Sequence, residues 1–310
     1  MPGIKEIRSR IKSVRNTGKI TRAMEMISSV KMRKAAESVV ALRPYAEIAW
    51  RIFHAVSSVR DTRESLALFD VRPVKKILFV VVTSNRGLCG SFNAQILRKL
   101  RTEMDRAQKE CPSASIEYAS LGKKGDARLK FLSGDIVASF PDVITDPSPS
   151  VIRSLTKFLF DGFEEHRWDR IVLLYTDYVS VLLQKPCARQ ILPFLDRDAD
   201  AHMEEMGNVE HADRRSGAHE KNESSAEYLI EPKPEKVLRA LLFRLIETQL
   251  LHAILESNAS QEAARMVAMK SATDAAKEMT GDLTLLYNQI RQAKVTQEIA
   301  ELSAGMAAVS

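Results

Sequence analysis

Helical periodicity dominates both ends of this chain. Toward the C-terminus, apolar residues recur at alternate spacings of four and three: Met279, Leu283, Leu286, Ile290 and Ala293. This is the spacing of a helix that packs along a partner helix. Strong helix formers dominate here and no proline follows Pro234, so we predict one helix over residues 235–309. Gly281, inside this helix, predicts a bend or a close contact with another helix.

The N-terminal segment, residues 1–60, carries a similar stripe. Its apolar positions start with spacings of three and four and then extend the same face: Ile4, Ile7, Ile11, Val14, Ile20, Met24 and Ile27. Each stripe is too apolar to face water alone, so the two segments are expected to pair as an antiparallel coiled coil. Pro44 predicts a kink or a new helix start.

Helix length predicts that the C-terminal helix projects from the rest of the chain. Roughly 75 helical residues reach about 110 Å. A middle domain of about 150 residues is only ~40 Å across. A helix of that length needs a partner beyond the globule.

Residues 73–195 have a different pattern, in which short apolar runs alternate with amphipathic segments. The apolar runs predict strands at 74–83, 115–121, 136–140, 170–178 and 187–195. The amphipathic segments predict helices at 93–109, 124–131 and 149–165. The first strand, VKKILFVVVT, is apolar nearly throughout, as in a parallel sheet buried on both faces. The fold class is therefore α/β: a Rossmann-like central domain combined with the coiled coil of the two terminal helices.

Charge is unevenly spread, although the net charge is only +6. Residues 1–43 hold eleven Lys or Arg and three acidic residues. This basic face is either solvated or complements something acidic, and a nucleic-acid-binding protein is the alternative function that it leaves open. Residues 196–227 hold ten acidic and four basic residues without apolar periodicity, so we expect an acidic mobile insertion.

Sequence signs of bond chemistry are sparse. Gly87 and Gly90 follow the first strand, but they match neither dinucleotide nor P-loop spacing. Gly122-Lys123-Lys124-Gly125 resembles a GxxG phosphate clamp, a pattern that tight turns also produce. The three cysteines are widely spaced, and the six histidines show no metal geometry. We expect no cofactor, no metal and no catalytic residue; an α/β enzyme with an unusual nucleotide site is a further alternative.

The sequence also argues against direct membrane insertion. Residues 74–82 are apolar but far shorter than the ~20 residues of a membrane span. Residues 1–5 show neither a signal-peptide apolar region nor a Ser/Arg-rich presequence. We expect a soluble protein that reaches a membrane only through partners.

Several motifs in order along the chain resemble the γ subunits of F-type ATP synthases. They are Ile20-Thr21-Arg22-Ala23-Met24-Glu25-Met26, Lys31-Met32-Arg33, Arg86-Gly87-Leu88-Cys89-Gly90, the run from Ala263 to Asp274, and the tail from Leu285 to Ile299. Two features depart from the family pattern: the acidic segment is longer, and Gly90-Ser91-Phe92-Asn93 replaces Gly-Gly-Leu-Asn.

The resemblance implies a non-catalytic rotor that carries torque. The shaft would couple ion flow through the membrane c ring to ATP synthesis or hydrolysis at the β subunits, by rotating inside the α/β hexamer. The implied partners are the α and β subunits, the ε subunit and the c ring, with no nucleic acid. The implied location is the cytoplasmic side of the bacterial inner membrane, as a peripheral subunit.

The resemblance also implies two sets of contact residues. Residues that contact the α/β ring would be Lys19, Arg22, Met24, Arg291, Gln292, Thr296 and Glu301. Residues on the foot, toward the c ring and ε, would be Tyr228 and Glu231. An isolated surface ion pair at such contacts contributes only ~1 kcal/mol or less, which suits contacts that must break as a shaft turns.

Overall fold

A computed structural model gives the fold. It describes residues 4–57, 66–131, 135–145, 147–194, 231 and 233–309. The acidic segment 196–227 lies outside the described residues. The chain divides into two compact units, which are described separately: residues 1–30 with 265–310, and residues 31–264.

The terminal helices are the longest elements. α1 spans Ile4–Ser57 and has 54 residues, and α7 spans Pro234–Val309 and has 76 residues. The single C-terminal helix is confirmed. α1 runs through Pro44 without a second helix beginning there, so the predicted new start is wrong. Both terminal helices cross the boundary between the units. Residues 4–30 of α1 and 265–309 of α7 belong to the first unit, and residues 31–57 of α1 and 234–264 of α7 belong to the second.

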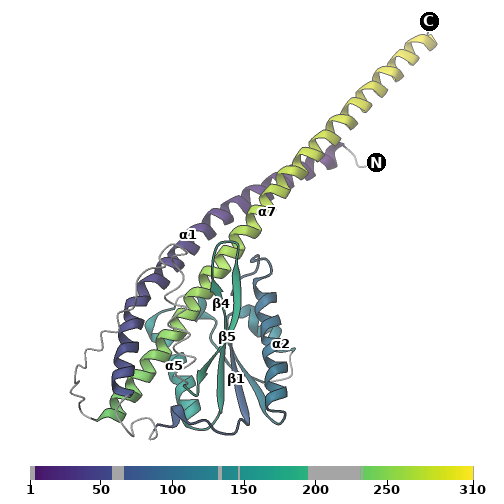
Figure 1. The fold of residues 1–310 in the computed structure, drawn as a ribbon. Coiled ribbons are helices and arrows are strands. Elements are labelled where there is room, and N and C mark those ends of the chain that lie inside the picture. Colours follow the sequence, from purple (N-terminus) through teal and green to yellow (C-terminus); the bar gives the residue numbers. More distant parts are fainter. Residues whose placement is uncertain are drawn as a thin grey trace. The chain divides into compact units, whose positions relative to one another are not determined.

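The second unit is built on a five-stranded sheet (Figure 1). The strand order is β3-β2-β1-β4-β5, in which only β4 and β5 pair antiparallel. The strands are β1 Lys76–Val82, β2 Ser115–Leu121, β3 Asp135–Ser139, β4 Arg170–Tyr178 and β5 Gln184–Leu192. All five predicted strands occur, and β5 begins three residues earlier than the sequence indicated.

The helices of the second unit include elements that the sequence did not reveal. The predicted helices appear as α2 Phe92–Glu110, α3 Lys123–Leu129 and α5 Pro149–Glu164. Two short elements were missed, the 3₁₀ helix η1 Ala67–Phe69 and the single turn α4 Asp142–Thr145. A period of 3.6 residues cannot be detected over three or four positions.

The sheet is buried on both faces because β1 points successive apolar side chains to opposite sides. Ile77, Phe79 and Val81 pack in the cluster that α2 covers. Leu78, Val80 and Val82 pack in a larger cluster. α2 and α5 flank the sheet on opposite sides (Figure 1). The strand therefore reads as continuously apolar, as a parallel strand with two covered faces should.

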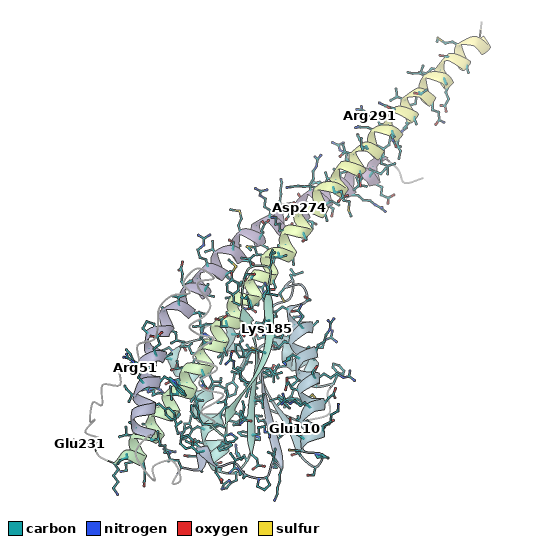
Figure 2. The ribbon with its side chains drawn as sticks, in the orientation of Figure 1. Arg51, Glu110, Lys185, Glu231, Asp274 and Arg291 are labelled. Carbon is teal, nitrogen blue, oxygen red and sulfur yellow. The ribbon has the colours of Figure 1, made fainter. Side chains whose placement is uncertain are left out.

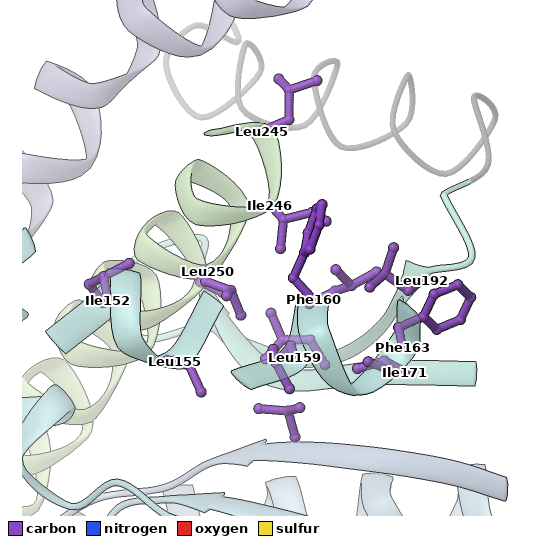
Figure 3. Close-up of a cluster of buried hydrophobic side chains, with 14 of the residues drawn as sticks. Ile152, Leu155, Leu159, Phe160, Phe163, Ile171, Leu192, Leu245, Ile246 and Leu250 are labelled. Atoms are coloured by element: carbon purple, nitrogen blue, oxygen red, sulfur yellow. The ribbon is translucent and has the colours of Figure 1, made fainter. Parts of the chain in front are cut away.

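The larger cluster joins α5 to α7, as Figure 3 shows, and also includes side chains of α1. α5 contributes Leu155 and Leu159, and α7 contributes Ile246 and Leu250, all fully buried. Phe53 of α1 is also fully buried and lies edge-on to Phe194, with ring centroids 5.2 Å apart. The inner halves of α1 and α7 are thus core helices of the α/β unit.

Candidate partner-binding surfaces

In the first unit, α1 and α7 meet along a seam of alternating three- and four-residue spacing. On α1 the buried or half-buried seam positions are Ile4, Ile7, Ile11, Val14, Gly18, Thr21 and Ser28. On α7 they are Met269, Thr273, Ala276, Thr280, Leu283, Tyr287 and Ile290. The predicted antiparallel pair is confirmed, since Gly18 faces Ala276 while the later Thr21 faces the earlier Thr273.

The middle of this seam is small and polar. The hydroxyls of Thr21 and Thr273 are hydrogen-bonded at 2.7 Å, and both residues are buried. A Cβ placed on Gly18 would lie 3.3 Å from the Cβ of Ala276, which is tighter than ordinary van der Waals contact. The two helices therefore approach each other closely at this level, and their register is fixed by a polar pair.

Several sequence expectations about this seam are wrong. Ile20 and Ile27 are 61% and 56% exposed, and Met279 is 53% exposed. Gly281 has no atom within 4 Å of a Cβ built on it, so the close helix contact lies at Gly18 instead. The sequence pattern assigned large apolar side chains to the middle of the seam, whereas small residues occupy it there and let the two backbones come close.

The apolar residues left outside the seam give α1 an exposed surface in the first unit. It consists of Ile20, Met26, Ile27 and Val30, all more than half exposed. Lys19 and Arg22, two of the expected ring contacts, are also exposed on this part of the helix, and Met24 is half-buried. A surface that combines exposed apolar groups and cations is suited to a protein partner.

α7 continues past the part that pairs with α1. Every side chain described from Arg291 onward is exposed (Figure 2). The expected ring contacts Arg291, Gln292, Thr296 and Glu301 all lie here. The polar groups mostly satisfy one another along the helix: Thr296 Oγ1 donates to the carbonyl of Gln292 at 3.0 Å, and Gln297 Nε2 donates to Glu301 Oε1 at 2.9 Å.

An apolar stripe on this extension was missed at the sequence level. Its members are spaced by four, three and four residues: Val295, Ile299, Leu302 and Met306. They are 48–70% exposed. The spacing is visible in the sequence, but it lies beyond Ala293, the last position of the predicted apolar series. Hereafter we call these four residues the tail stripe.

The expected foot residues are only partly described. Glu231 is exposed and lies three residues before α7 begins (Figure 2). Tyr228 lies outside the described residues.

The turn from Gly122 to Gly125 is filled by internal contacts. Gly122 has φ +113°, and a Cβ there would lie 2.2 Å from the carbonyl oxygen of Thr83. The N–H groups that could hold a phosphate are already used: Gly125 donates to Thr83 Oγ1 at 2.8 Å and Lys123 to Asn85 Oδ1 at 2.9 Å. The turn is tight packing between strand and helix, so the GxxG pattern gives no support to a nucleotide site.

Within the described residues, no group of three or more His, Cys, Asp or Glu side chains could hold a metal ion. Burial raises the pKa of Cys187 to about 12, so its thiol stays protonated at neutral pH and is a poor nucleophile. Across the same residues, no helix is long and apolar enough to cross a membrane.

The fold and these surfaces define a class: an α/β-domain protein with a pair of terminal helices, of which the C-terminal one continues as an exposed extension with an apolar stripe. A family model described as ATP synthase matches residues 3–309. Curated relatives named ATP synthase gamma chain come from Roseiflexus castenholzii and Roseiflexus sp., at 38% and 37% identity. Each alignment covers 100% of this chain and 99% of the relative. The chain therefore belongs to the ATP synthase gamma chain family.

Solved structures support the same fold. A chain of the Euglena gracilis mitochondrial ATP synthase, from a structure of OSCP, F1 and c-ring, matches with a TM-score of 0.60 at 19% identity, covering 99% of this chain and 94% of that one. A chain from the central stalk and c-ring of the Tetrahymena thermophila enzyme matches with a TM-score of 0.55 at 19% identity, covering 82% and 99%. Neither comparison supports the nucleic-acid alternative.

Proposed function

We propose that this chain is the central rotor shaft of an F-type ATP synthase. Rotation of the shaft inside the ring of α and β subunits couples ion flow through the c ring to ATP synthesis or hydrolysis at the β subunits. The observation that carries this proposal is the gamma chain match over the full length of the protein. In this role the chain itself performs no bond chemistry, and the filled Gly122–Gly125 turn and the protonated thiol of Cys187 are consistent with that.

The terminal helices, residues 1–60 and 235–309, supply the shaft in this proposal. The tail stripe and its exposed neighbours Arg291, Gln292, Thr296 and Glu301 contact the α/β ring. Lys19, Arg22 and Met24 contact it along α1, where the exposed cations meet acidic groups. These contacts are weak individually, because exposed ion pairs contribute about 1 kcal/mol or less. Weak contacts allow the shaft to leave one β subunit and engage the next.

The α/β domain, residues 73–195, forms the foot. It meets the c ring and the ε subunit, and Tyr228 and Glu231 face that side. The protein is then peripheral on the cytoplasmic side of the bacterial inner membrane and is held there by its partners.

Reconstitution tests this function directly. The purified chain is mixed with isolated α and β subunits, and ATP hydrolysis is assayed with each component left out in turn. We expect steady hydrolysis only when all three are present, with this chain retained in the complex on gel filtration. A chain that neither joins the complex nor changes its activity would overturn the proposal.

A further inference from the structure

β4 extends beyond the strand that it pairs with in the sheet. The ladder between β1 and β4 ends at the pair Val81 and Leu174, whereas β4 continues to Tyr178. On its other side, Thr176 stands opposite Pro186 of β5, which has no N–H to donate. The backbone groups of Thr176 therefore face the side that β1 has left, and a central strand needs partners there.

Three side chains of α7 take the place of the missing strand. Ser257 Oγ accepts a hydrogen bond from the N–H of Thr176 at 3.1 Å, and Ser260 Oγ donates to the carbonyl of Thr176 at 3.1 Å. Glu256 Oε2 accepts from the N–H of Tyr178 at 2.7 Å. The helix thus continues the hydrogen-bonding pattern of the sheet with its side chains.

These contacts are deeply buried. Glu256, Ser257 and Ser260 are 3%, 2% and 0% exposed. A buried carboxylate is costly unless it is hydrogen-bonded, and Glu256 also lies 3.6 Å from Nε2 of the buried His252. Burial and the nearby Glu256 both raise the pKa of Tyr178. A sequence that places two hydroxyls and a carboxylate on a core face needs a specific reason, since apolar residues would bury there at no polar cost.

Directional hydrogen bonds fix the orientation of α7 on the sheet, which apolar packing alone does not. Leu242, Ile246 and Leu250 hold α7 against the α/β core, but burial of apolar area is non-directional. Three hydrogen bonds from successive turns to one strand end fix the rotation of the helix about its own axis and its position along the strand. α1 makes a weaker contact with the same strand end: the Tyr178 hydroxyl lies 3.6 Å from Sδ of Met32.

We propose that Glu256, Ser257 and Ser260 are positioning residues that form a torsional joint, through which torque passes between the sheet domain and α7. The inference rests on the proposed function as a rotor. Ser260 lies four residues before Ala264, the last residue of the second unit, and α7 continues without a break from there to Val309. The joint therefore lies just before the residue at which α7 passes from the second unit to the first.

The test uses the assembled complex. The variant combines Glu256→Met, Ser257→Ala and Ser260→Ala, and the matched control combines Glu278→Met and Ser271→Ala, two exposed positions on the same helix. The ring of α and β subunits is fixed to a surface. A rod is attached to the α/β domain of this chain through Arg101→Cys on the exposed side of α2.

Rotation is stopped by withholding ATP, and the angle of the rod is recorded over time. We expect its mean-square angular fluctuation to rise about twofold in the variant, because directional bonds are lost while apolar burial remains.

ATP hydrolysis is expected to stay close to that of the control, while ions moved per ATP fall. A variant with the fluctuation and ion coupling of the control would overturn the joint. If the combined variant does not assemble, two single variants are compared, Glu256→Gln and Glu256→Met. The glutamine oxygen still accepts a hydrogen bond from the N–H of Tyr178, whereas methionine does not. Only Glu256→Met should therefore increase the fluctuation of the rod and the rate of amide exchange at Tyr178. Equal values for these two variants would also overturn the joint.

The unmodified chain separates the two ideas. If it fails to join the head or to turn, the rotor proposal fails. If it turns normally and the joint variants are as stiff as their controls, only the joint inference fails.

Discussion

Small residues decide how closely the two terminal helices approach in the first unit. Gly18 faces Ala276, and the Thr21–Thr273 hydroxyl pair lies one turn away. Larger apolar residues such as Ile20 stay exposed beside the seam. A close seam leaves apolar groups on the outside, where a partner can cover them, so the choice of small seam residues and the existence of the exposed surface have one cause.

A substitution at Gly18 tests this arrangement. Gly18→Leu should weaken the pairing of α1 and α7 by ~1–3 kcal/mol, because a side chain cannot fit against Ala276 without moving the helices apart. Amide exchange measured by mass spectrometry over residues 4–30 and 265–290 reports the free energy of opening.

The matched control is Gly281→Leu, in the partner helix α7. A Cβ at Gly281 meets nothing within 4 Å, so this change should stabilise α7 by about 0.5–1 kcal/mol through helix propensity alone. Equal destabilisation by both changes would show that Gly18 is not in a tight contact.

The extension of α7 is the element that most clearly requires a partner. Its tail stripe repeats the spacing of a packed helix, yet each member is 48–70% exposed. The seam on α7 ends at Ile290, so in the first unit α1 supplies no cover for the stripe. Isolated helical segments of this kind gain little stability from propensity and much from packing, which indicates that the extension is completed by assembly.

Charging the tail stripe should therefore damage assembly more than folding. We expect Ile299→Asp to reduce recovery of the complex with α and β about tenfold, corresponding to ~1.4 kcal/mol of binding. The thermal unfolding midpoint of the isolated chain should stay within the small range typical of surface changes.

Ala304→Asp provides the control on the opposite side of the same helix. It adds the same charge away from the stripe, so complex recovery should change less than with Ile299→Asp. A matching loss for both variants would mean that the partner contacts all sides of the extension and that the stripe has no special part.

The whole molecule has an unequal division of stability between its two units. Among the described residues, both large apolar clusters belong to residues 31–264, which include residues 31–57 of α1 and 234–264 of α7. In the described part of the first unit, burial follows the seam, whose middle is polar. Stability should therefore be concentrated in the α/β unit, and opening of the helical pair should be cheaper than global unfolding.

A fragment of residues 31–264 should consequently fold by itself. We expect native-like amide protection in β1 and a cooperative thermal transition, because every member of both apolar clusters is present. Equimolar peptides of residues 1–30 and 265–310 should show little helix in water, since helices depend on packing for most of their stability and the middle of this seam is small and polar.

Circular dichroism and amide exchange check both halves of this expectation. An unfolded 31–264 fragment would show that the first unit contributes to the core. A cooperative transition in the peptide mixture would show that the seam is stronger than its residues suggest.

Much of the fold could be read from the sequence because its signals are local. The strand over 170–178 and the single helix over 235–309 follow from residue type and period, and both are found within one residue of their expected ends. The short elements η1 and α4 are too brief to show a period. The expected contact residues are exposed where a partner could reach them: Lys19, Arg22, Arg291, Gln292, Thr296 and Glu301. Their roles stay predictions, as do those of Met24, Tyr228 and Glu231.

The sequence by itself determined the α/β class, the two long terminal helices and their pairing, because apolar period and helix propensity act over neighbouring residues. Only the tertiary structure decided which face forms the seam, since closeness of approach at Gly18 depends on a residue more than 250 positions away. It also decided that Glu256, Ser257 and Ser260 hold the end of β4. Those hydrogen bonds depend on the residue at which β1 ends, and the sequence of α7 alone does not predict that position.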